Sequence, residues 1–398
     1  MGAAQPQLDK TALRYLQESG SLLHLKGFPM KNSVIFLPAA KSFTFMAIGV
    51  LGLLTVVVLN KLAFTEISLF GEGTPRLNLD YILLSILIAI STLCIFYSIV
   101  FWRSDRSSIV QNEHPTFGRF EQQAIAISLL STVIFLFLFL FRPTTFNRLS
   151  LEDGAIEWAS AILLFVTSAA LVASFLKLRK TMGETILKVI AIFFATVFFV
   201  MGMEEISWMQ RVFGLESSQH FEGNVQGELN LHNFATGSIE IAYYFGAFAL
   251  TVFIPFMRKK NVFYQDNNLF LLIPRPWIIY VGAVACAYNF DMWNIFPMQI
   301  AFFSTCFILF YMMITHRSKT TAVISGIALV NVILTQGAFL LITDRYARGW
   351  EVTEYREFLM PLAFLAYSLD VLMQISKKQT DLLTTQSLHH TQSPTMKT

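Results

Sequence analysis

The sequence predicts an all-α polytopic membrane protein with about ten transmembrane helices and both termini in the cytoplasm. The first observation behind this prediction is composition. Of the 398 residues 55% are hydrophobic and only 14% are charged, and the mean hydropathy is +0.56, which does not fit a soluble globular domain. The second observation is a series of apolar runs of about 20 residues, the length that crosses a bilayer as a helix. These runs are continuous, whereas the strands of a membrane β-barrel alternate apolar and polar residues.

The positions of lysine and arginine supply the third observation. If the N-terminal tail lies inside, 21 of the 29 Lys and Arg residues fall in inside segments. Nearly every inside segment then holds more of them than its outside neighbours, as expected for cytoplasmic loops. A missed or additional helix would scramble this alternation, so it supports ten spans with both termini inside.

Three regions follow in chain order. Residues 1–42 are polar and mildly basic and predict a cytoplasmic tail, which is either a short amphipathic helix on the membrane surface or loosely ordered. Residues 43–375 predict the transmembrane domain, and residues 376–398 predict a disordered cytoplasmic tail. The ten spans are expected near 43–60, 80–102, 123–141, 156–176, 186–203, 238–257, 269–290, 295–315, 321–343 and 358–375.

The seventh span is the least regular, because Pro274-Arg275-Pro276 interrupts it. We expect its membrane part to begin at Pro276, with Arg275 reaching back to the interface. Asp370 lies near the inner end of the tenth span and is expected to pair with Lys377 or Lys378. The cysteines Cys94, Cys286 and Cys306 all fall in apolar runs and predict buried thiols without a disulfide.

The most polar part of the chain is the predicted outer loop 204–237. Five glutamates, one arginine and two histidines lie between Met203 and Asn233, directly after an apolar span, where charge is costly unless it is paired or functional. If the helix continues, Glu204, Trp208 and Arg211 share one face. Glu205 then lies about 100° away from Glu204. Arg211 is expected to hold one of the two adjacent carboxylates, either as part of a site or as an ion pair that fixes the helix end.

A carboxylate and an imidazole follow in the same loop. Glu228 and His232 are four residues apart, a spacing that suits either a divalent metal or a base with its orienting partner. With only two histidines on the outer side, a three-histidine zinc site is excluded. A metal site of Glu205, Glu228 and His232 is the hypothesis that remains, and its ligands favour Mg, Mn, Ca or a mixed zinc site.

Acidic residues also mark other outer helix ends. They concentrate at the outer ends of spans 4, 5, 6 and 10, a placement that topology does not explain because acids carry little topological signal. At span 4, Glu152 and Asp153 are typical of helix capping, whereas Glu157 lies one turn deeper and joins the candidates. The last outer loop, 344–357, carries nearly balanced charges and predicts a salt-bridged cap or interfacial helix.

Three strings of residues carry a resemblance to a known family. EDGxxEW, EEISWxQRxFG and QGExNLHN occur in this order within roughly residues 150–235, and they are similar to a family of uncharacterised multi-pass bacterial membrane proteins. That family has glycines flanking the EEISW core, where this chain has Met203 and Met209. The resemblance implies a bacterial inner membrane and a common location for the three strings. It implies no activity.

Three classes of function remain open from the sequence. The first is an enzyme with an outward-facing carboxylate and histidine site that acts on a lipid or lipid-linked substrate. The second is a non-catalytic scaffold or assembly protein, and the third is a transporter. Membrane lipids are the expected partners, a divalent metal is the cofactor to be considered, and the net charge of +3 without a basic patch argues against nucleic acid. The candidate catalytic residues are Glu157, Glu204, Glu205, Arg211, Glu228 and His232.

Overall fold

The computed structural model describes residues 36–65, 67–75, 77–102, 117–151, 154–181, 185–214, 236–260, 262 and 268–391. This part of the chain is helical and contains no strand. Within it, nine helices are long and apolar enough to cross a membrane. Many of their large apolar side chains point outwards, among them Phe43 with 75% of its surface exposed and Leu334 with 60%. Such surfaces are expected against lipid and not against water.

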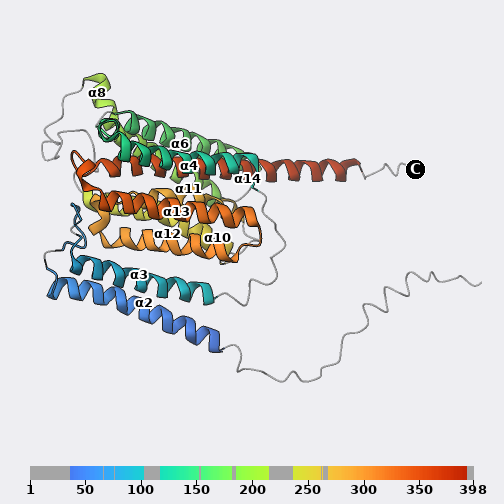
Figure 1. The fold of residues 1–398 in the computed structure, drawn as a ribbon. Coiled ribbons are helices and arrows are strands. Elements are labelled where there is room, and N and C mark those ends of the chain that lie inside the picture. Colours follow the sequence, from blue (N-terminus) through green and yellow to red (C-terminus); the bar gives the residue numbers. More distant parts are fainter. Residues whose placement is uncertain are drawn as a thin grey trace, which may run out of the picture.

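The long helices lie side by side in one bundle (Figure 1). They are α2 (Phe36–Leu62), α3 (Leu79–Trp102), α4 (Arg119–Phe141), α6 (Ala155–Thr181), α7 (Thr185–Glu205), α12 (Phe296–Thr315), α13 (Lys319–Leu341) and α14 (Glu351–Thr391), with α9 (Thr236–Phe248) continuing through a π-helical turn (Ala249–Phe253) into α10 (Ile254–Lys259). The short helices α5 (Pro143–Leu149) and α8 (Gln210–Phe213) lie in connections. The described chain begins and ends at the same end of the bundle, opposite α8 (Figure 1).

The seventh predicted span is not a long helix. It consists of a 3-10 turn (Asn268–Leu271), the short helix α11 (Ile278–Gly282), a 3-10 helix (Ala283–Ala287) and another 3-10 turn (Asp291–Asn294). Proline supplies no N–H at 274 and 276, which prevents a regular helical start there. Residues 277–293 are buried within the bundle, and irregular backbone at membrane depth is tolerated where protein surrounds it.

This buried segment packs very closely against the π-helical turn. A Cβ atom on Gly282 would lie 2.2 Å from Thr251 Oγ1, so only glycine fits at this crossing. The segment connects two ends of the molecule, because Arg275 pairs with Asp370 near one end and Asp291 accepts hydrogen bonds from Thr353 near the other.

Asp370 has a different partner from the one that the sequence predicts. Arg275 Nε donates to its two carboxylate oxygens at 2.8 and 3.0 Å, and Gln374 Nε2 donates at 2.9 Å. Arg275 also pairs with Glu121 at 2.8 Å. The prediction that Asp370 pairs with Lys377 or Lys378 is therefore wrong. The interruption of the helix at Pro274 and Pro276 places Arg275 beside the buried carboxylate of Asp370.

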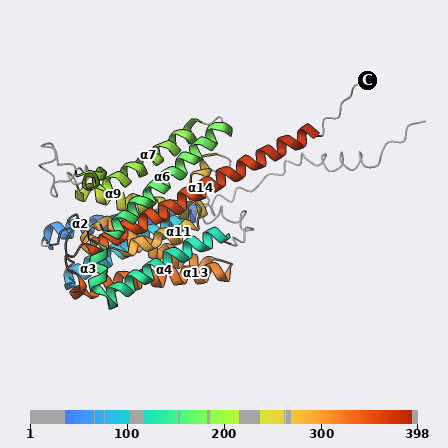
Figure 2. The same ribbon diagram turned by 90° about the horizontal axis from the view of Figure 1, so that it is seen from above.

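Two boundaries differ from the predicted ones. The first helix begins at Phe36 and not near residue 43, and α14 continues to Thr391, past residue 376 where the sequence predicts a disordered tail. Figure 2 shows α14 extending beyond the bundle. The predicted amphipathic tail at 1–35 lies outside the described residues. All three cysteines are free thiols.

Candidate functional site

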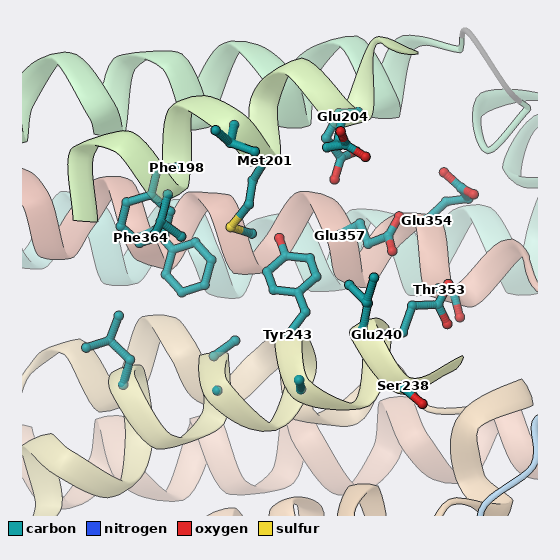
Figure 3. A pocket seen from close by; sticks show the side chains of 18 of the residues that line it. Phe198, Met201, Glu204, Ser238, Glu240, Tyr243, Thr353, Glu354, Glu357 and Phe364 are labelled. Carbon is teal, nitrogen blue, oxygen red and sulfur yellow. The ribbon is translucent and has the colours of Figure 1, made fainter. Parts of the chain in front are cut away.

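A cavity of about 1040 Å³ separates α7 from α9, with α14 at its back (Figure 3). Its size is at the upper limit of ordinary small-molecule pockets. Helix α7 packs on α6 and contributes one face to the cavity, at the helical spacing of Phe194, Phe198, Met201 and Glu205. The cavity therefore follows the length of the two helices, from their polar ends into the apolar interior of the bundle.

One end of the cavity is acidic. Six segments of the chain each bring at least one carboxyl group to it, and in α6, α7, α9 and α14 these residues lie at the helix ends. The eight acidic residues that line the cavity are Glu72, Glu157, Glu204, Glu205, Glu240, Asp291, Glu354 and Glu357. Among the lining residues there is no lysine, arginine or histidine in the described part of the chain. So many carboxyl groups in one partly buried space cannot all ionise freely, and they are expected to share protons.

The other end of the cavity is apolar. It is lined by Phe194 and Phe198 of α7, Leu250 and Ile254 beyond α9, and Phe364 of α14. The rings of Phe198 and Phe364 are tilted against each other with their centroids 4.8 Å apart, and both lie to the left of Met201 in Figure 3. The cavity thus joins an acidic compartment to a hydrocarbon-like one.

The end of α7 positions the adjacent pair Glu204 and Glu205. The helix ends at Glu205, and the next residues, Ser207, Trp208 and Met209, all have positive φ angles of 46°, 53° and 62°. Left-handed backbone at three consecutive non-glycine residues is costly and is typical of functional sites. The helix therefore does not continue through Trp208 to Arg211, which was the condition for these residues to share one face. The turn instead directs Trp208 Nε1 to Glu204 Oε1, at 2.6 Å.

Glu205 is the member of the pair with the densest acidic surroundings. The charges of Glu357, Glu354 and Glu157 act on it, in that order of strength. These carboxyl groups come from α14 and α6, which pack against each other. Two of the predicted candidates, Glu157 and Glu205, are thus brought together by the structure, and Glu204 lines the same cavity.

The first turns of α14 contribute the opposing carboxyl groups and one buried cation. Tyr244 donates its hydroxyl to Glu357 Oε1 at 2.5 Å. The Arg356 guanidinium carbon lies 3.8 Å from the centre of the Tyr244 ring, and Arg356 Nη1 donates to Asn289 at 2.6 Å. Arg356 is only 2% exposed. This buried cation lies behind Tyr244 and balances part of the acidic charge without lining the cavity.

Two loops bring Glu72 and Asp291 to the rim. The loop after α2 is fixed to the loop before α12 by hydrogen bonds from Gly73 N to Asp291 O at 2.9 Å and from Asn294 Nδ2 to Gly73 O at 3.0 Å. Thr353 donates its hydroxyl to the Asp291 carboxylate at 2.8 Å. The Gly73 contacts join residues about 220 positions apart and the Thr353 contact joins residues 62 positions apart, so the sequence gives no local sign of them.

Burial raises the pKa of Asp291 above its ordinary value, although the charge of Arg356 and the hydrogen bond from Thr353 lower it in part. Partial burial and then the charge of Asp291 also raise the pKa of the Glu72 carboxyl, against the opposing effects of a hydrogen bond from Glu240 and the charge of Arg356. Both shifts favour protonated carboxyl groups at the rim.

Two polar atoms in the middle of the cavity wall lack partners. Tyr243 Oη and Glu240 Oε2 are buried and have no hydrogen-bond partner in the part of the chain that the structure describes. Figure 3 shows Tyr243 pointing from α9 across the cavity towards α7. A buried polar group without a partner costs free energy, so both atoms are suited to a partner that enters the cavity.

The remaining predicted site residues are not tested. Glu228 and His232 lie outside the described residues, as do Glu152 and Asp153, and the same holds for the side chain of Arg211. Among the residues that are described, no group of three or more His, Cys, Asp and Glu side chains is arranged to hold a metal ion. The metal site of Glu205, Glu228 and His232 therefore stays a prediction.

Sequence reasoning missed several members of the site. The last outer loop was expected to be a balanced cap, and part of it is: Glu351 accepts the backbone N–H groups of Ala347, Arg348 and Gly349. Glu354 and Glu357, however, face the cavity. The concentration of acids at the ends of spans 4, 5, 6 and 10 was the available signal, and it correctly indicated four of the six contributing segments.

Comparison with known proteins finds no matching family model, no matching curated protein sequence and no matching solved structure.

Proposed function

We propose that this protein is an enzyme of a bacterial inner membrane that acts on a lipid or lipid-linked substrate from the outer side. The observation that carries the proposal is the single cavity that joins an acidic compartment to an apolar one. Polar chemistry takes place at the first, and the hydrocarbon part of the substrate lies in the second. The excess of Lys and Arg in the segments at the opposite end supports an outward-facing acidic end.

The chemistry that fits is hydrolysis or group transfer with carboxyl groups as general acid and base. Glu205 and Glu357 face one cavity from two helices, and their charges interact. In such a pair one group is protonated while the other is ionised. The ionised carboxylate takes the proton from an attacking water or hydroxyl group, and the protonated one gives its proton to the oxygen of the leaving group.

Neighbouring residues have supporting roles in this proposal. Tyr244 holds Glu357 by a hydrogen bond and lies over Arg356, so it is a positioning residue. Glu157 and Glu204 adjust the charge around Glu205. Arg211, Glu228 and His232 remain proposed members of the site on the strength of their position in the sequence. A divalent metal remains a proposed cofactor, with Glu205, Glu228 and His232 as its proposed ligands.

The proposal is tested by incubating the purified protein in vesicles of bacterial lipid extract and following the lipids by mass spectrometry. We expect at least one lipid class to be converted, and the Glu205→Gln variant to convert it about 100-fold more slowly, the contribution typical of a general acid or base. Asp344→Asn is the matched control, because Asp344 is 77% exposed and does not line the cavity. The same rate in both variants, or no conversion by the parent protein, contradicts the proposal.

A transporter is the second candidate, because the irregular segment 277–294 crosses the bundle interior, as broken helices do in transporters. A lipid that changes leaflet in the vesicles without chemical change would support this candidate against the first.

A further inference from the structure

The charge of the cavity restricts the head group of the molecule that it binds. Eight carboxyl groups line one end, and the single nearby cation among the described side chains, Arg356, is 2% exposed and already hydrogen-bonded to Asn289 and Thr353. A negatively charged head group would add to this repulsion. A positively charged head group that donates hydrogen bonds would relieve it, since N–H donors to carboxylates form strong charge-assisted hydrogen bonds.

Two unpartnered atoms support the same conclusion, and one of them, Tyr243 Oη, lies outside the acidic cluster. Tyr243 Oη and Glu240 Oε2 are fully buried, and neither has a partner among the described residues. They lie on successive turns of α9 where the acidic compartment meets the apolar one (Figure 3). A carboxylate oxygen and a phenol oxygen can both accept hydrogen bonds from an ammonium group that carries three N–H donors.

The apolar compartment has the dimensions of one hydrocarbon chain. From Tyr243 to Ile254 the lining extends along twelve residues of nearly continuous helix, and the eleven steps between them give about 16 Å at 1.5 Å per residue. This is about half of the hydrocarbon thickness of a bilayer. The wall of the apolar compartment that begins in α9 is formed by small residues, Ala242, Gly246 and Ala249. A Cβ on Gly246 would meet no atom within 4 Å.

We propose that the cavity binds an amphiphile with an amine head group and one apolar chain, its ammonium among Glu205, Glu240 and Glu357 and its chain between α7 and α9. The inference deepens the proposed function and rests on it only in using the same cavity, because binding is measured without turnover. The positive charge comes with the ligand in this account, which distinguishes it from an anionic lipid held through a divalent metal.

The test uses three photoreactive probes with the same eighteen-carbon chain, ending in a primary amine, an alcohol or a carboxylate. The full-length protein is placed in nanodiscs of phosphatidylcholine, each probe is activated by light, and the labelled peptides are mapped by mass spectrometry. We expect the amine probe to label the lining residues of α7 and α9 about tenfold more than the other two, the ratio given by one charge-assisted hydrogen bond.

Matched variants locate the two parts of the ligand. Gly246→Leu places a large side chain in the apolar compartment and is expected to abolish labelling of the cavity by the amine probe. Gly337→Leu is its control, because a Cβ there also meets nothing within 4 Å but Gly337 of α13 does not line the cavity. Glu357→Gln is expected to reduce labelling by the amine probe about tenfold and to leave the alcohol probe unchanged.

The outcomes separate the two proposals. Equal labelling by all three probes, or stronger labelling by the carboxylate probe with or without added Mg²⁺, overturns the amine inference and leaves a lipid-binding cavity in place. Absence of cavity labelling by every probe in the correctly folded protein overturns both this inference and the proposed function.

Discussion

Two parts of α14 treat buried charge in opposite ways. Near the middle of the helix, Asp370 is fully buried and satisfied by Arg275, Trp277 and Gln374. Near the N-terminal end, Glu354 and Glu357 face a cavity that they share with six other acidic residues. The first arrangement is complete within the protein, whereas the second shares its cavity with two buried atoms, Tyr243 Oη and Glu240 Oε2, that have no partner among the described residues. We therefore propose that the first maintains the fold and that the second belongs to a ligand-binding site.

The largest expected effect comes from breaking the buried ion pair of Arg275 and Asp370. Arg275→Met leaves the Asp370 carboxylate buried without its cation, and removal of one partner of a buried pair typically costs 3–5 kcal/mol, so we expect a loss of about 3 kcal/mol in the free energy of unfolding. Thermal unfolding in detergent measures it. The double variant Arg275→Met, Asp370→Asn should recover most of the loss, and a single variant as stable as the parent contradicts the structural role of this pair.

Glu205→Gln is the corresponding change at the acidic end. We expect it to leave the unfolding temperature unchanged or higher, because it removes one charge from a repulsive group, while lipid conversion falls about 100-fold. The same unfolding measurement and the vesicle assay give both values. If this variant unfolds as readily as Arg275→Met, the acidic end of the cavity also maintains the fold, and the contrast between it and the Arg275–Asp370 pair is wrong.

Glycine substitutions at the end of α7 and in the turn after it are expected to change the free energy of unfolding by smaller amounts and in opposite directions. Met209 has a φ of 62°, which glycine adopts without strain, so Met209→Gly is expected to stabilise the protein by about 1 kcal/mol. Met203 lies in the last turn of α7, where glycine should cost about 0.5–1 kcal/mol. A higher unfolding temperature for Met209→Gly and a lower one for Met203→Gly would confirm the prediction. A lower unfolding temperature for both variants would show that the contacts of the Met209 side chain outweigh the strain of its backbone.

The smallest effect is a dependence of stability on pH. The pKa of Glu72 is raised in the folded protein, so folding favours its protonated form, and its contribution to stability falls as the pH rises from the unfolded pKa through the folded one. Glu72→Gln should therefore raise the unfolding temperature by about 1–2 °C at pH 7.5 and leave it unchanged at pH 4. A larger gain at pH 4 would contradict the direction of the shift.

Local sequence patterns predicted the helices well. Continuous apolar runs located nine helices of spanning length in the described residues, because hydrophobic length and helix formation are local properties. The seventh span was recognised as irregular from Pro274 and Pro276, but its 3-10 helices and the close packing of Gly282 against Thr251 were not predicted. The pairing of Arg275 with Asp370 joins residues 95 positions apart and has no local signal.

The site was predicted in part for the same reason. Glu157, Glu204 and Glu205 were selected because they interrupt apolar sequence near helix ends, and all three line the cavity. Glu354 and Glu357 were set aside because neighbouring arginines seemed to balance them, yet Arg356 turns away behind Tyr244 and Arg348 binds the carbonyl oxygens of Asn147 and Ser150. Which side of a helix a charge faces could not be read from a loop whose structure depends on distant contacts.

The most direct test of the central claim, that the cavity between α7 and α9 holds a lipid chain, is native mass spectrometry of the protein purified in mild detergent. We predict that one lipid-sized molecule remains bound to the parent protein and to Gly337→Leu, and that Gly246→Leu loses it. Retention of the same molecule by all three proteins, or by none of them, would contradict the account.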